Sequence, residues 1–442
     1  MIKFFFFFTS ISSYAQIINI PDANFKAELL AAHTLYSNPS TLGYQIAQNS
    51  NDDYVTIDTN NDGEIEQSEA LAIYRLGVGG GFPINDLTGI ECFINLKYFS
   101  CYNQPVTSIN LATLTNLISL QLINSGFTQL YLTGLTHLED LACWQNNQLT
   151  SLHFENNPML NSIGCYDGNL SSLDVSNLPA LATLSCQNNQ LTAINIGDLQ
   201  NFAYLDCNHN LLTNLDLPSM PMGKLDCSYN QLTSLIFNAN IGSVYCNNNQ
   251  ISTANFEIMT LLRELDCSHN QLTGLDLNNN QSPIYPFTLR CSYNNLMDIK
   301  IKNGFFQEFN TYWSWAHNPN LSTICADDFE IQALRSFLSF NGYNLQNLTI
   351  NSNCNLNNSS FDNSASVKVE PNPSNGNLVI KFDNLQEKVI VSLSNIFGQI
   401  VSSKTVTSVQ TINYNISGNN GLYFLAIENQ NGEKKIVKVI KE

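Results

Sequence analysis

The sequence predicts an α/β-type repeat solenoid with a parallel β-sheet and few helices, bounded by an N-terminal helical cap and followed by a C-terminal all-β sandwich. Three observations lead to this fold class. A phrase that contains cysteine recurs about every 21 residues in the middle of the chain. Residues 368–442 contain short runs in which apolar and polar residues alternate. The charge balance changes near residue 364, which indicates a domain boundary.

The chain begins with a segment that predicts export. Lys3 precedes a phenylalanine-rich run, and Ser13 and Ala15 supply the small residues of a cleavage site. We therefore expect residues 1–15 to be a secretory signal peptide, too short to span a bilayer; a disordered hydrophobic N-terminus is the alternative. No other stretch approaches the roughly 20 apolar residues of a membrane helix. We expect the mature protein to be an exported monomer without a transmembrane helix.

The formal net charge of −18 is unevenly distributed. From residue 364 onward there are eight Lys and Arg and six Asp and Glu, whereas the rest of the chain carries ten basic and thirty acidic residues. An acidic body repels the phosphate backbone of nucleic acids and an anionic membrane surface. The sequence therefore argues against a nucleic-acid partner.

Residues 16–83 precede the repeats and are predicted to form the N-terminal cap. The segment IPDANFKAELLAA indicates a helix that begins after Asp22 or Asn24, and SEALAIYRL indicates a second helix. Between them, residues 58–69 (DTNNDGEIEQSE) match the calcium-loop template D-x-[DN]-x-[DN]-G-x5-E at every specified position.

The loop at 58–69 is predicted to bind Ca²⁺ as a structural ion. Gly63 permits the sharp turn, and oxygen ligands at this spacing suit a hard cation. The segment before the loop is a poor helix, so the loop resembles the half-hand of dockerin-type modules more than a paired sensor. A solvated acidic turn is the alternative. The predicted ligands are Asp58, Asn60, Asp62, the backbone carbonyl of Glu64, and Glu69.

Residues 84–325 contain about eleven repeats of roughly 21 residues, which predicts a solenoid. From Cys143 onward the intervals between cysteines are 22, 21, 21, 20, 19, 21 and 24 residues. The repeated phrase, apolar-x-Cys-x-x-Asn-x-Leu-Thr-x-Leu, has the spacing of a leucine-rich repeat. Parallel stacking of one short strand per unit buries a core that no single unit could bury. The repeated cysteines, here called the cysteine ladder, are Cys101, Cys143, Cys165, Cys186, Cys207, Cys227, Cys246, Cys267 and Cys291.

The cysteine ladder is interpreted as part of the core. An apolar residue precedes most ladder cysteines by two positions, as Leu205 precedes Cys207, and strand alternation places both on one face. Leu122 and Trp315 take the cysteine position in other repeats, so the position favours an apolar group, and a free thiol supplies one. Disulfides between rungs and a metal ladder are the alternatives. Side chains in line along a ladder seldom reach the torsion angle that a disulfide requires. A metal ladder is disfavoured because no paired Cys-x-x-Cys motifs are present.

An asparagine follows most ladder cysteines by three residues and is interpreted as structural. Its carboxamide can satisfy backbone N–H and C=O groups that lose their partners where the strand ends. Gln104, Ser125 and Gly168 depart from the pattern, so we expect their rungs to be less regular. The asparagines are Asn189, Asn210, Asn230, Asn249, Asn270 and Asn294.

These repeats resemble the cysteine-ladder leucine-rich repeats of internalin-type bacterial surface proteins. The resemblance covers residues 84–325 and rests on the agreement of many copies of the phrase. It implies a solenoid that serves in protein recognition or adhesion, and it does not identify the partner.

A C-terminal cap is predicted over residues 326–354. The segment ADDFEIQALRSFLSFNGY has the pattern of an amphipathic helix. Cys325 and Cys354 lie outside the cysteine ladder in an exported protein, which predicts a disulfide between them that closes the cap. Residues 355–367, rich in Asn and Ser, are predicted to form a linker.

Residues 368–442 are predicted to form a β-sandwich from runs such as LVIKF, VIVSLSN and LYFLAIE. The motifs PNP, NIFGQIV, GLYFLAI and KIVKVIK are similar to the type A C-terminal sorting domain of the Bacteroidetes type IX secretion system. This resemblance implies that the secretion machinery reads the tail as an address and leaves the body secreted or on the outer cell surface. An ordinary β-sandwich adhesion module is the alternative. The motif residues are Pro371, Asn372, Pro373, Gly376, Gly398, Gly421, Tyr423, Lys438 and Lys441.

Side chains beside the inward-facing ones are predicted to form a ligand-binding face. Aromatic rings next to acceptors and amides suit a protein or a glycan. Eleven rungs at about 4.8 Å give a face about 50 Å long. The alternative is that these residues only shield the sheet. The predicted residues are Tyr102, Trp144, Tyr166, Asp206, His209, Asp226, Tyr229, Tyr245, Asp266, His269 and Tyr293.

The sequence favours a non-enzymatic function. It contains no Gly-x-Ser-x-Gly elbow, no His-Glu-x-x-His motif and no nucleotide loop. We predict a secreted or cell-surface protein that binds an extracellular protein or glycan in adhesion or recognition. A passive surface coat or matrix component and a secreted hydrolase are the alternatives.

Overall fold

The computed structural model describes residues 16–32, 46–79, 81–281, 287–305, 309, 312–354, 367–395, 399–429 and 434–442. The chain divides into two compact units, Met1–Ser352 and Asn353–Glu442. The predicted signal peptide and residues 355–366 of the predicted linker lie outside the described residues. Of the helices described, none is long and apolar enough to cross a membrane.

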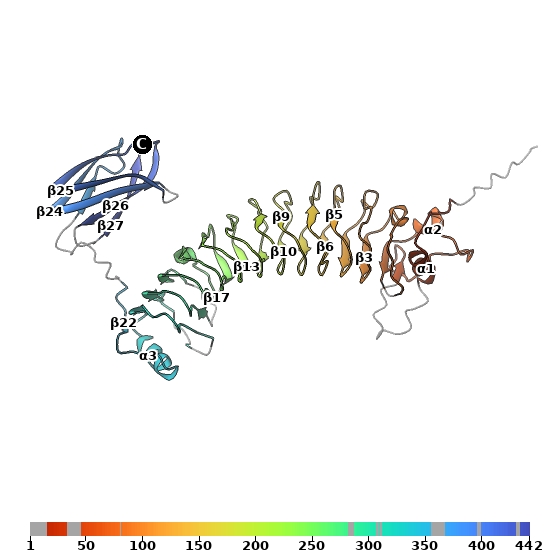
Figure 1. Ribbon diagram of the computed structural model, residues 1–442, viewed down its shortest axis with the longest axis horizontal. Coiled ribbons are helices and arrows are strands. Elements are labelled where there is room, and N and C mark those ends of the chain that lie inside the picture. The colour runs from red at the N-terminus through yellow and green to blue at the C-terminus, as the bar shows by residue number, and fades with distance from the viewer. Residues whose placement is uncertain are drawn as a thin grey trace, which may run out of the picture. The chain divides into compact units, whose positions relative to one another are not determined.

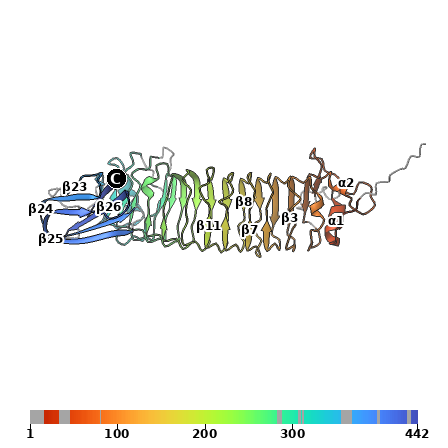
Figure 2. The same cartoon turned by 90° about the horizontal axis from the view of Figure 1, so that it is seen from above.

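The first unit is a β-solenoid built on a twelve-stranded sheet (Figure 1). The first two strands of this sheet pair antiparallel, and the strands from β2 onward pair parallel. From β3 onward each strand belongs to one repeat, so the rungs lie side by side along the solenoid (Figure 2). The strands, in sheet order, are β1 (Ile46–Gln48), β2 (Arg75–Val78), β3 (Tyr98–Tyr102), β4 (Ser119–Ile123), β6 (Asp140–Ala142), β8 (Ser162–Gly164), β10 (Thr183–Ser185), β12 (Tyr204–Asp206), β13 (Met222–Asp226), β15 (Ile241–Tyr245), β17 (Glu264–Asp266) and β19 (Thr288–Arg290).

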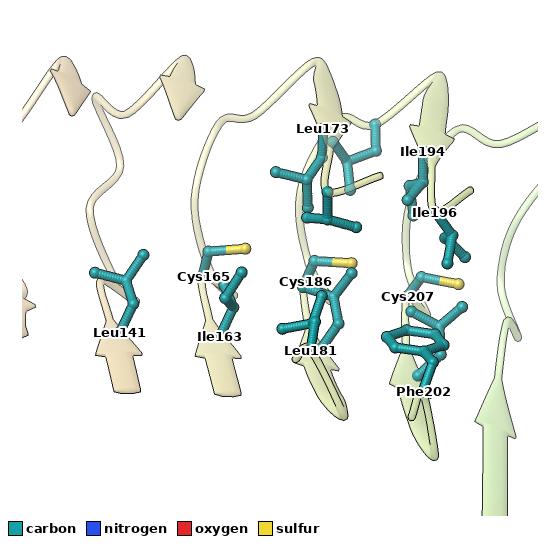
Figure 3. Close-up of a cluster of buried hydrophobic side chains, with 14 of the residues drawn as sticks. Leu141, Ile163, Cys165, Leu173, Leu181, Cys186, Ile194, Ile196, Phe202 and Cys207 are labelled. Carbon is teal, nitrogen blue, oxygen red and sulfur yellow. The ribbon is translucent and has the colours of Figure 1, made fainter. Parts of the chain in front are cut away.

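The register of the sheet keeps equivalent residues in line. Leu184 pairs with Leu205, and Leu205 pairs with Leu225. The ladder cysteines follow two residues later, and they are free and buried. Figure 3 shows three of their sulfur atoms within the cluster of leucine, isoleucine and phenylalanine side chains. Within the described residues, the interpretation of the thiols as core residues is therefore confirmed, and no ladder cysteine is in a disulfide.

Short strands on the other side of the solenoid close the core. Leu173 and Ile194 point inward from this side toward the cysteine ladder (Figure 3). These strands form separate ladders rather than one continuous sheet. The pairs are β5 (Gln129–Tyr131) with β7 (Ser151–His153), β9 (Ser172–Asp174) with β11 (Ala193–Asn195), and β14 (Ser234–Leu235) with β16 (Thr253–Ala254); a fourth ladder joins β18 (Gly274–Asp276), β20 (Asp298–Lys300), β21 (Thr323–Cys325) and β22 (Thr349–Asn351).

The asparagines connect neighbouring rungs. The Asn210 amide donates to the carbonyl of Cys207 on its own rung (3.0 Å) and to that of Cys186 on the preceding rung (3.1 Å). Its oxygen accepts from the amide of Leu191 (2.9 Å). Gln104 makes a similar connection, since its side chain accepts from Ile84 N and donates to Tyr102 O. These contacts confirm the structural interpretation of the asparagines.

The N-terminal cap differs from its prediction in one helix. Helix α1 (Ala23–Ala31) begins after Asp22, whose carboxylate accepts from the amides of Asn24 and Phe25. Helix α2 (Gln67–Ala70) is only one turn long, because the residues from Arg75 onward already form strand β2. The solenoid sheet therefore begins before residue 84. A 3₁₀ turn, η1 (Ile90–Cys92), follows the cap, and a second, η2 (Phe256–Ile258), lies in a later repeat.

A helix and two disulfide-bonded cysteines follow or end the repeats on the C-terminal side. Helix α3 (Ile331–Phe340) buries Leu334 and Leu338, as its amphipathic pattern predicts. Cys325 and Cys354 are both disulfide-bonded, unlike the cysteines of the ladder.

The second unit holds one antiparallel five-stranded sheet with its own core. The runs LVIKF and VIVSLSN, predicted as two strands, form one long strand with a register shift between Lys381 and Gln386. Side chains from both halves of that strand, such as Ile380 and Val391, share one core cluster. A single sheet that folds onto itself thus replaces the predicted pair of sheets. Its strands are β23 (Val367–Glu370), β24 (Asn377–Asn395), β25 (Ile400–Asn415), β26 (Gly421–Asn429) and β27 (Lys434–Lys441).

Candidate functional site

The candidate site is the outward side of the twelve-stranded sheet, here called the strand face. Because side chains alternate along a strand, two columns point outward from each rung: the residue before the buried apolar position and the residue after it. The residue directly after the ladder cysteine adds a third column where the strand ends. A partner that approaches this side of the sheet meets these three columns.

Four predicted residues lie beside the strand face rather than on it. A residue two positions after an inward cysteine would point inward again if the strand continued. Instead the chain turns there, and His209, Tyr229, His269 and Tyr293 have left-handed backbones with φ between 50° and 57°. Their rings stack along the solenoid, with centroids 4.2 Å apart for His209–Tyr229 and for His269–Tyr293. His317 extends the second stack, 4.0 Å from Tyr293.

An aromatic pair lies in the third column of the strand face. The rings of Trp144 and Tyr166 are nearly parallel, with centroids 5.3 Å apart. A Cβ atom at Gly164, in the neighbouring column, would lie 3.7 Å from both rings, which is ordinary van der Waals contact, so both rings lie close to the backbone of this strand. Tyr102, two rungs earlier, hydrogen-bonds to Gln121.

A group of charged residues lies on the strand face between β12 and β19. Lys224 lies between the rings of Tyr204 and Tyr245, 5.4 Å and 5.0 Å from their centroids. Arg290 contacts Glu264 at 3.2 Å and Asp266 at 3.7 Å. The sequence prediction missed Lys224, Glu264 and Arg290. The register of the repeat could have predicted their place on the strand face, because each lies directly before or after a buried apolar position.

Asp206 and Asp226 face each other on adjacent rungs of this group. Asp206 is 8% exposed, and its pKa is raised by burial and by the neighbouring charge of Asp226. One oxygen of each carboxylate accepts hydrogen bonds from the residue two positions on, Asn208 or Ser228. The aspartates therefore also hold the end of the strand in place.

The ladder thiols are unsuited to nucleophilic chemistry. Burial raises the pKa of Cys165 to about 12, and it raises the pKa of Cys186 and Cys207 well above the ordinary value. Thiols in this state are protonated at neutral pH, and a thiol must ionise to act as a nucleophile.

The loop at 58–69 adopts the turn that its motif requires. Gly63 has φ of 83°, and the Asp58 carboxylate accepts from the amides of Asp62 (3.3 Å) and Gly63 (3.0 Å). Asn60 lies beside Asp62, with 3.0 Å between its amide nitrogen and an Asp62 carboxylate oxygen. The side chain of Glu64 pairs with Lys26 at 2.6 Å, which leaves the Glu64 carbonyl as the predicted ligand. Among the described residues, no group of three or more His, Cys, Asp or Glu side chains forms a ready-made metal site.

Two glutamates at the end of this loop, Glu66 and Glu69, interact closely with each other. Glu69 accepts from the Thr59 amide (2.6 Å) and from the Glu66 amide (3.0 Å), and it is buried. The hydrogen bond to Glu69, burial, and the charges of Glu69 and Asp62 raise the pKa of Glu66 to about 7. The sequence prediction did not include Glu66. Its oxygen-rich surroundings fit a hard cation, which would relieve this repulsion.

The sorting motif residues hold the second unit together. Asn372 donates to Lys438 O (2.6 Å) and accepts from Ile440 N (2.9 Å), which links the PNP motif to the last strand. Lys441 donates to the carbonyls of Ile416 (3.0 Å) and Gly418 (2.7 Å).

The remaining motif residues occupy turns and strand positions of the same unit. Gly376 has φ of 99°, in the left-handed region, and the Tyr423 hydroxyl donates to Asn419 O (2.7 Å). Pro371 and Pro373 are both preceded by cis peptide bonds, and Gly421 begins strand β26. Gly398 lies outside the described residues.

Comparison with known families identifies the tail. Residues 368–442 match the family described as Secretion system C-terminal sorting domain. The chain therefore carries a type IX secretion tail, which places the protein at the cell surface or in the medium. No curated protein sequence matches the chain.

Several solved structures are similar to this chain at low identity. The functional domain of InlJ from Listeria monocytogenes, described as including a cysteine ladder, is 20% identical, with 97% of this chain and 99% of that chain covered and a TM-score of 0.41. The internalin InlF from Listeria monocytogenes is 19% identical, with coverages of 78% and 100% and a TM-score of 0.45. YopM from Yersinia enterocolitica is 22% identical, with coverages of 57% and 60% and a TM-score of 0.40.

Proposed function

We propose that this protein binds an extracellular protein through the strand face, as an adhesion or recognition module of the cell surface or its surroundings. The observation that carries the proposal is the composition of the face. Stacked Trp144 and Tyr166 lie in one part of it and Lys224, Asp226 and Arg290 in another. Aromatic and arginine side chains dominate the binding energy of protein interfaces.

The arrangement of the rings favours a protein over a glycan. A sugar stacks on the open face of an aromatic ring, and in the pairs Trp144–Tyr166, His209–Tyr229 and His269–Tyr293 one face of each ring is already covered by its partner. The ring edges and the charged groups remain available, and these suit the side chains of a protein. A face about 50 Å long also has room for an interface of standard size, roughly 800 Å² on each partner.

Binding to an array of extracellular proteins tests the proposal. We expect saturable binding by the purified full-length protein, and we expect Trp144→Ala with Tyr166→Ala to weaken it at least tenfold, since anchors of this kind contribute about 2 kcal/mol or more. Phe340→Ala removes an exposed ring from the C-terminal cap and serves as the matched control. A passive coat component would show no saturable ligand, and a glycan ligand would appear on a glycan array instead.

We also propose that the loop at 58–69 binds Ca²⁺ and stabilises the N-terminal cap. The turn at Gly63 and the facing carboxylates of Glu66 and Glu69 support this proposal. Asp58, Asn60, Asp62, Glu69 and the Glu64 carbonyl would hold the ion. An isolated extracellular site of this type binds at roughly 10⁻⁴ to 10⁻³ M.

A further inference from the structure

A cavity of about 420 Å³ lies on the side of the solenoid opposite the strand face. It is placed where two of the short ladders meet: β5 pairs with β7, and β9 pairs with β11, but β7 and β9 belong to separate sheets. Figure 1 shows β5 and β9 on this side, with β6 and β10 on the other. A partner at the strand face would therefore leave the cavity accessible.

The repeat that contains β7 is also one residue longer than the repeat that follows it. The repeat from Cys143 to Cys165 has 22 residues, and the following repeat has 21. The additional residue lies between Asn146 and Leu149. The asparagine follows the cysteine by three positions in both repeats, but Leu149 follows Asn146 by three positions whereas Leu191 follows Asn189 by two. β7 still pairs in register with β5 of the preceding repeat, and the pairing ends between β7 and β9.

The floor of the cavity is apolar. Phe154 occupies the position that Leu132 and Val175 fill in the neighbouring repeats, yet those two are fully buried and Phe154 is only partly buried. Leu152 and Leu178 complete the floor. An aromatic ring that should belong to the core is thus open to a ligand.

The rim of the cavity combines stacked rings with acidic groups. Tyr131 and His153 pair in register, and their rings are stacked with centroids 4.6 Å apart. Tyr131 covers one face of the His153 ring, and the other face is turned toward the rung of Asp174. Asp174 and Glu155 both line the cavity, and apart from His153 no basic side chain does.

The two carboxylates are ready to accept further hydrogen bonds. Partial burial alone would raise the pKa of Asp174, but hydrogen bonds from the Ser176 hydroxyl and amide and from Asn195 outweigh it and lower the pKa. Asp174 is therefore charged and held in a fixed orientation. Among the described residues, the Glu155 carboxylate has no hydrogen-bond partner. The cavity thus offers negative charge and unused acceptors.

We propose that this cavity binds an arginine side chain of a partner protein. A guanidinium group is planar and can extend the Tyr131–His153 stack as a third layer. Its five N–H donors match the acceptors of Glu155 and Asp174, and its aliphatic stem can lie on Phe154 and Leu178. A lysine ammonium lacks the planar surface, and a neutral sugar does not use the charge of the two carboxylates.

The test uses the full-length protein and Nα-acetyl-argininamide as the probe. Titration is followed by NMR of the histidine ring signals, of which the chain has six. We expect saturable changes at His153, no binding of the isosteric neutral probe Nα-acetyl-citrullinamide, and several-fold weaker binding of Nα-acetyl-lysinamide. Glu155→Gln with Asp174→Asn is expected to weaken the argininamide affinity at least tenfold.

The matched control separates the cavity from the general acidity of the chain. Asp216→Asn with Glu257→Gln removes the same charge from exposed positions away from the cavity and is expected to leave the affinity unchanged. Equal loss in both double variants, or equal binding of citrullinamide, would overturn the proposal. Saturation of His153 by a mono- or disaccharide but not by argininamide would also overturn it. Thermal unfolding of each variant verifies that the solenoid remains folded.

Discussion

The inward and outward columns of the same sheet behave differently. Toward the core, one position is cysteine on nine rungs, and the asparagine that follows makes the same hydrogen bonds on rung after rung. Toward the solvent, the column between the buried residues changes from Ser185 to Asp206, Tyr245 and Arg290 over a few rungs. The constant inward residues are required by the fold, whereas the variable outward residues are free to be selected for binding.

The difference has a simple physical origin. An inward side chain contacts the equivalent side chains of the rungs before and after it, so one residue that fits can be repeated on every rung. An outward side chain also meets solvent or a partner, so its contacts with the neighbouring rungs do not require the same residue on every rung. Substitutions in the two sets of columns should therefore have effects of different size and sign.

The largest effect is expected from Asn230→Leu in the inward set. The Asn230 amide donates to the carbonyls of Cys207 (3.0 Å) and Cys227 (3.1 Å), and its oxygen accepts from Leu212 N (2.9 Å). Leucine leaves these buried groups without partners, at about 1–3 kcal/mol for each. We expect a loss of about 3 kcal/mol or more in the free energy of unfolding, measured by urea denaturation.

Asn247→Leu is the outward counterpart of this variant. Asn247 lies directly after Cys246 on the strand face and is half-exposed. We expect a change within about 0.5 kcal/mol, as for most surface substitutions. Similar losses in the two variants would contradict the division into structural and functional columns.

A smaller loss is expected when a ladder thiol becomes a hydroxyl. Cys207 is fully buried, and serine would place a polar group in the apolar core without a designed partner. We expect Cys207→Ser to destabilise the protein by about 2 kcal/mol and Cys92→Ser, at a half-exposed position, by less than about 0.5 kcal/mol. Alkylation under native conditions checks the same contrast, since Cys92 should react while Cys207 reacts only after unfolding.

The repeated part of the fold could be predicted because each feature occurs many times. The period, the buried thiols and the asparagine connections follow from copies that agree, and so does the parallel sheet. Features that occur only once in the chain were harder to predict from the sequence. The run SEALAIYRL has helical periodicity, yet Arg75–Val78 pair with β3 because a neighbouring strand is available there. The two runs joined in β24 could not be recognised as one strand, since the residues between them read as a turn.

The residues of the strand face, the proposed binding surface, could be predicted only in part. The residues in columns beside the ladder were found, but the sequence does not show that the chain turns directly after the ladder cysteine, so His209 and Tyr229 were expected on the sheet. The cavity beside β7 lies where two short ladders end, and the sequence does not show which of the short strands pair with one another.

The N-terminal cap gives a prediction that depends on pH. Glu66 has an ordinary pKa of 4.5 and a pKa of about 7 in the folded protein, so folding favours its protonated form. Without Ca²⁺, cap stability should therefore be full below about pH 4.5 and decline as the pH rises through 7. At pH 7.5, 10 mM Ca²⁺ should replace the proton and add about 1–3 kcal/mol.

Thermal unfolding at several pH values, with Ca²⁺ or with Mg²⁺, measures this effect. Asp62→Asn should abolish the Ca²⁺ response, whereas Asp52→Asn, outside the loop, should retain it. A cap whose stability is the same with and without Ca²⁺ at pH 7.5 would show that the loop is only a solvated acidic turn.

Apart from the control variants, the smallest effect is expected from Asp206→Asn on the strand face, and its sign is opposite to that of Asn230→Leu and Cys207→Ser. Burial and the charge of Asp226 raise the pKa of Asp206 above 3.8, so the ionised carboxylate destabilises the folded state and stability falls as the pH rises through that pKa. Asparagine removes the charge and keeps an oxygen that can accept from Asn208. We expect a gain of less than about 1 kcal/mol at pH 7 and none near pH 3, with no gain for exposed Asp216→Asn. A loss at pH 7 would mean that the hydrogen bonds to Asn208 outweigh the repulsion and that Asp206 belongs to the structural set. A gain would mean that this position retains a charge at the expense of stability, as is common where a residue serves a partner.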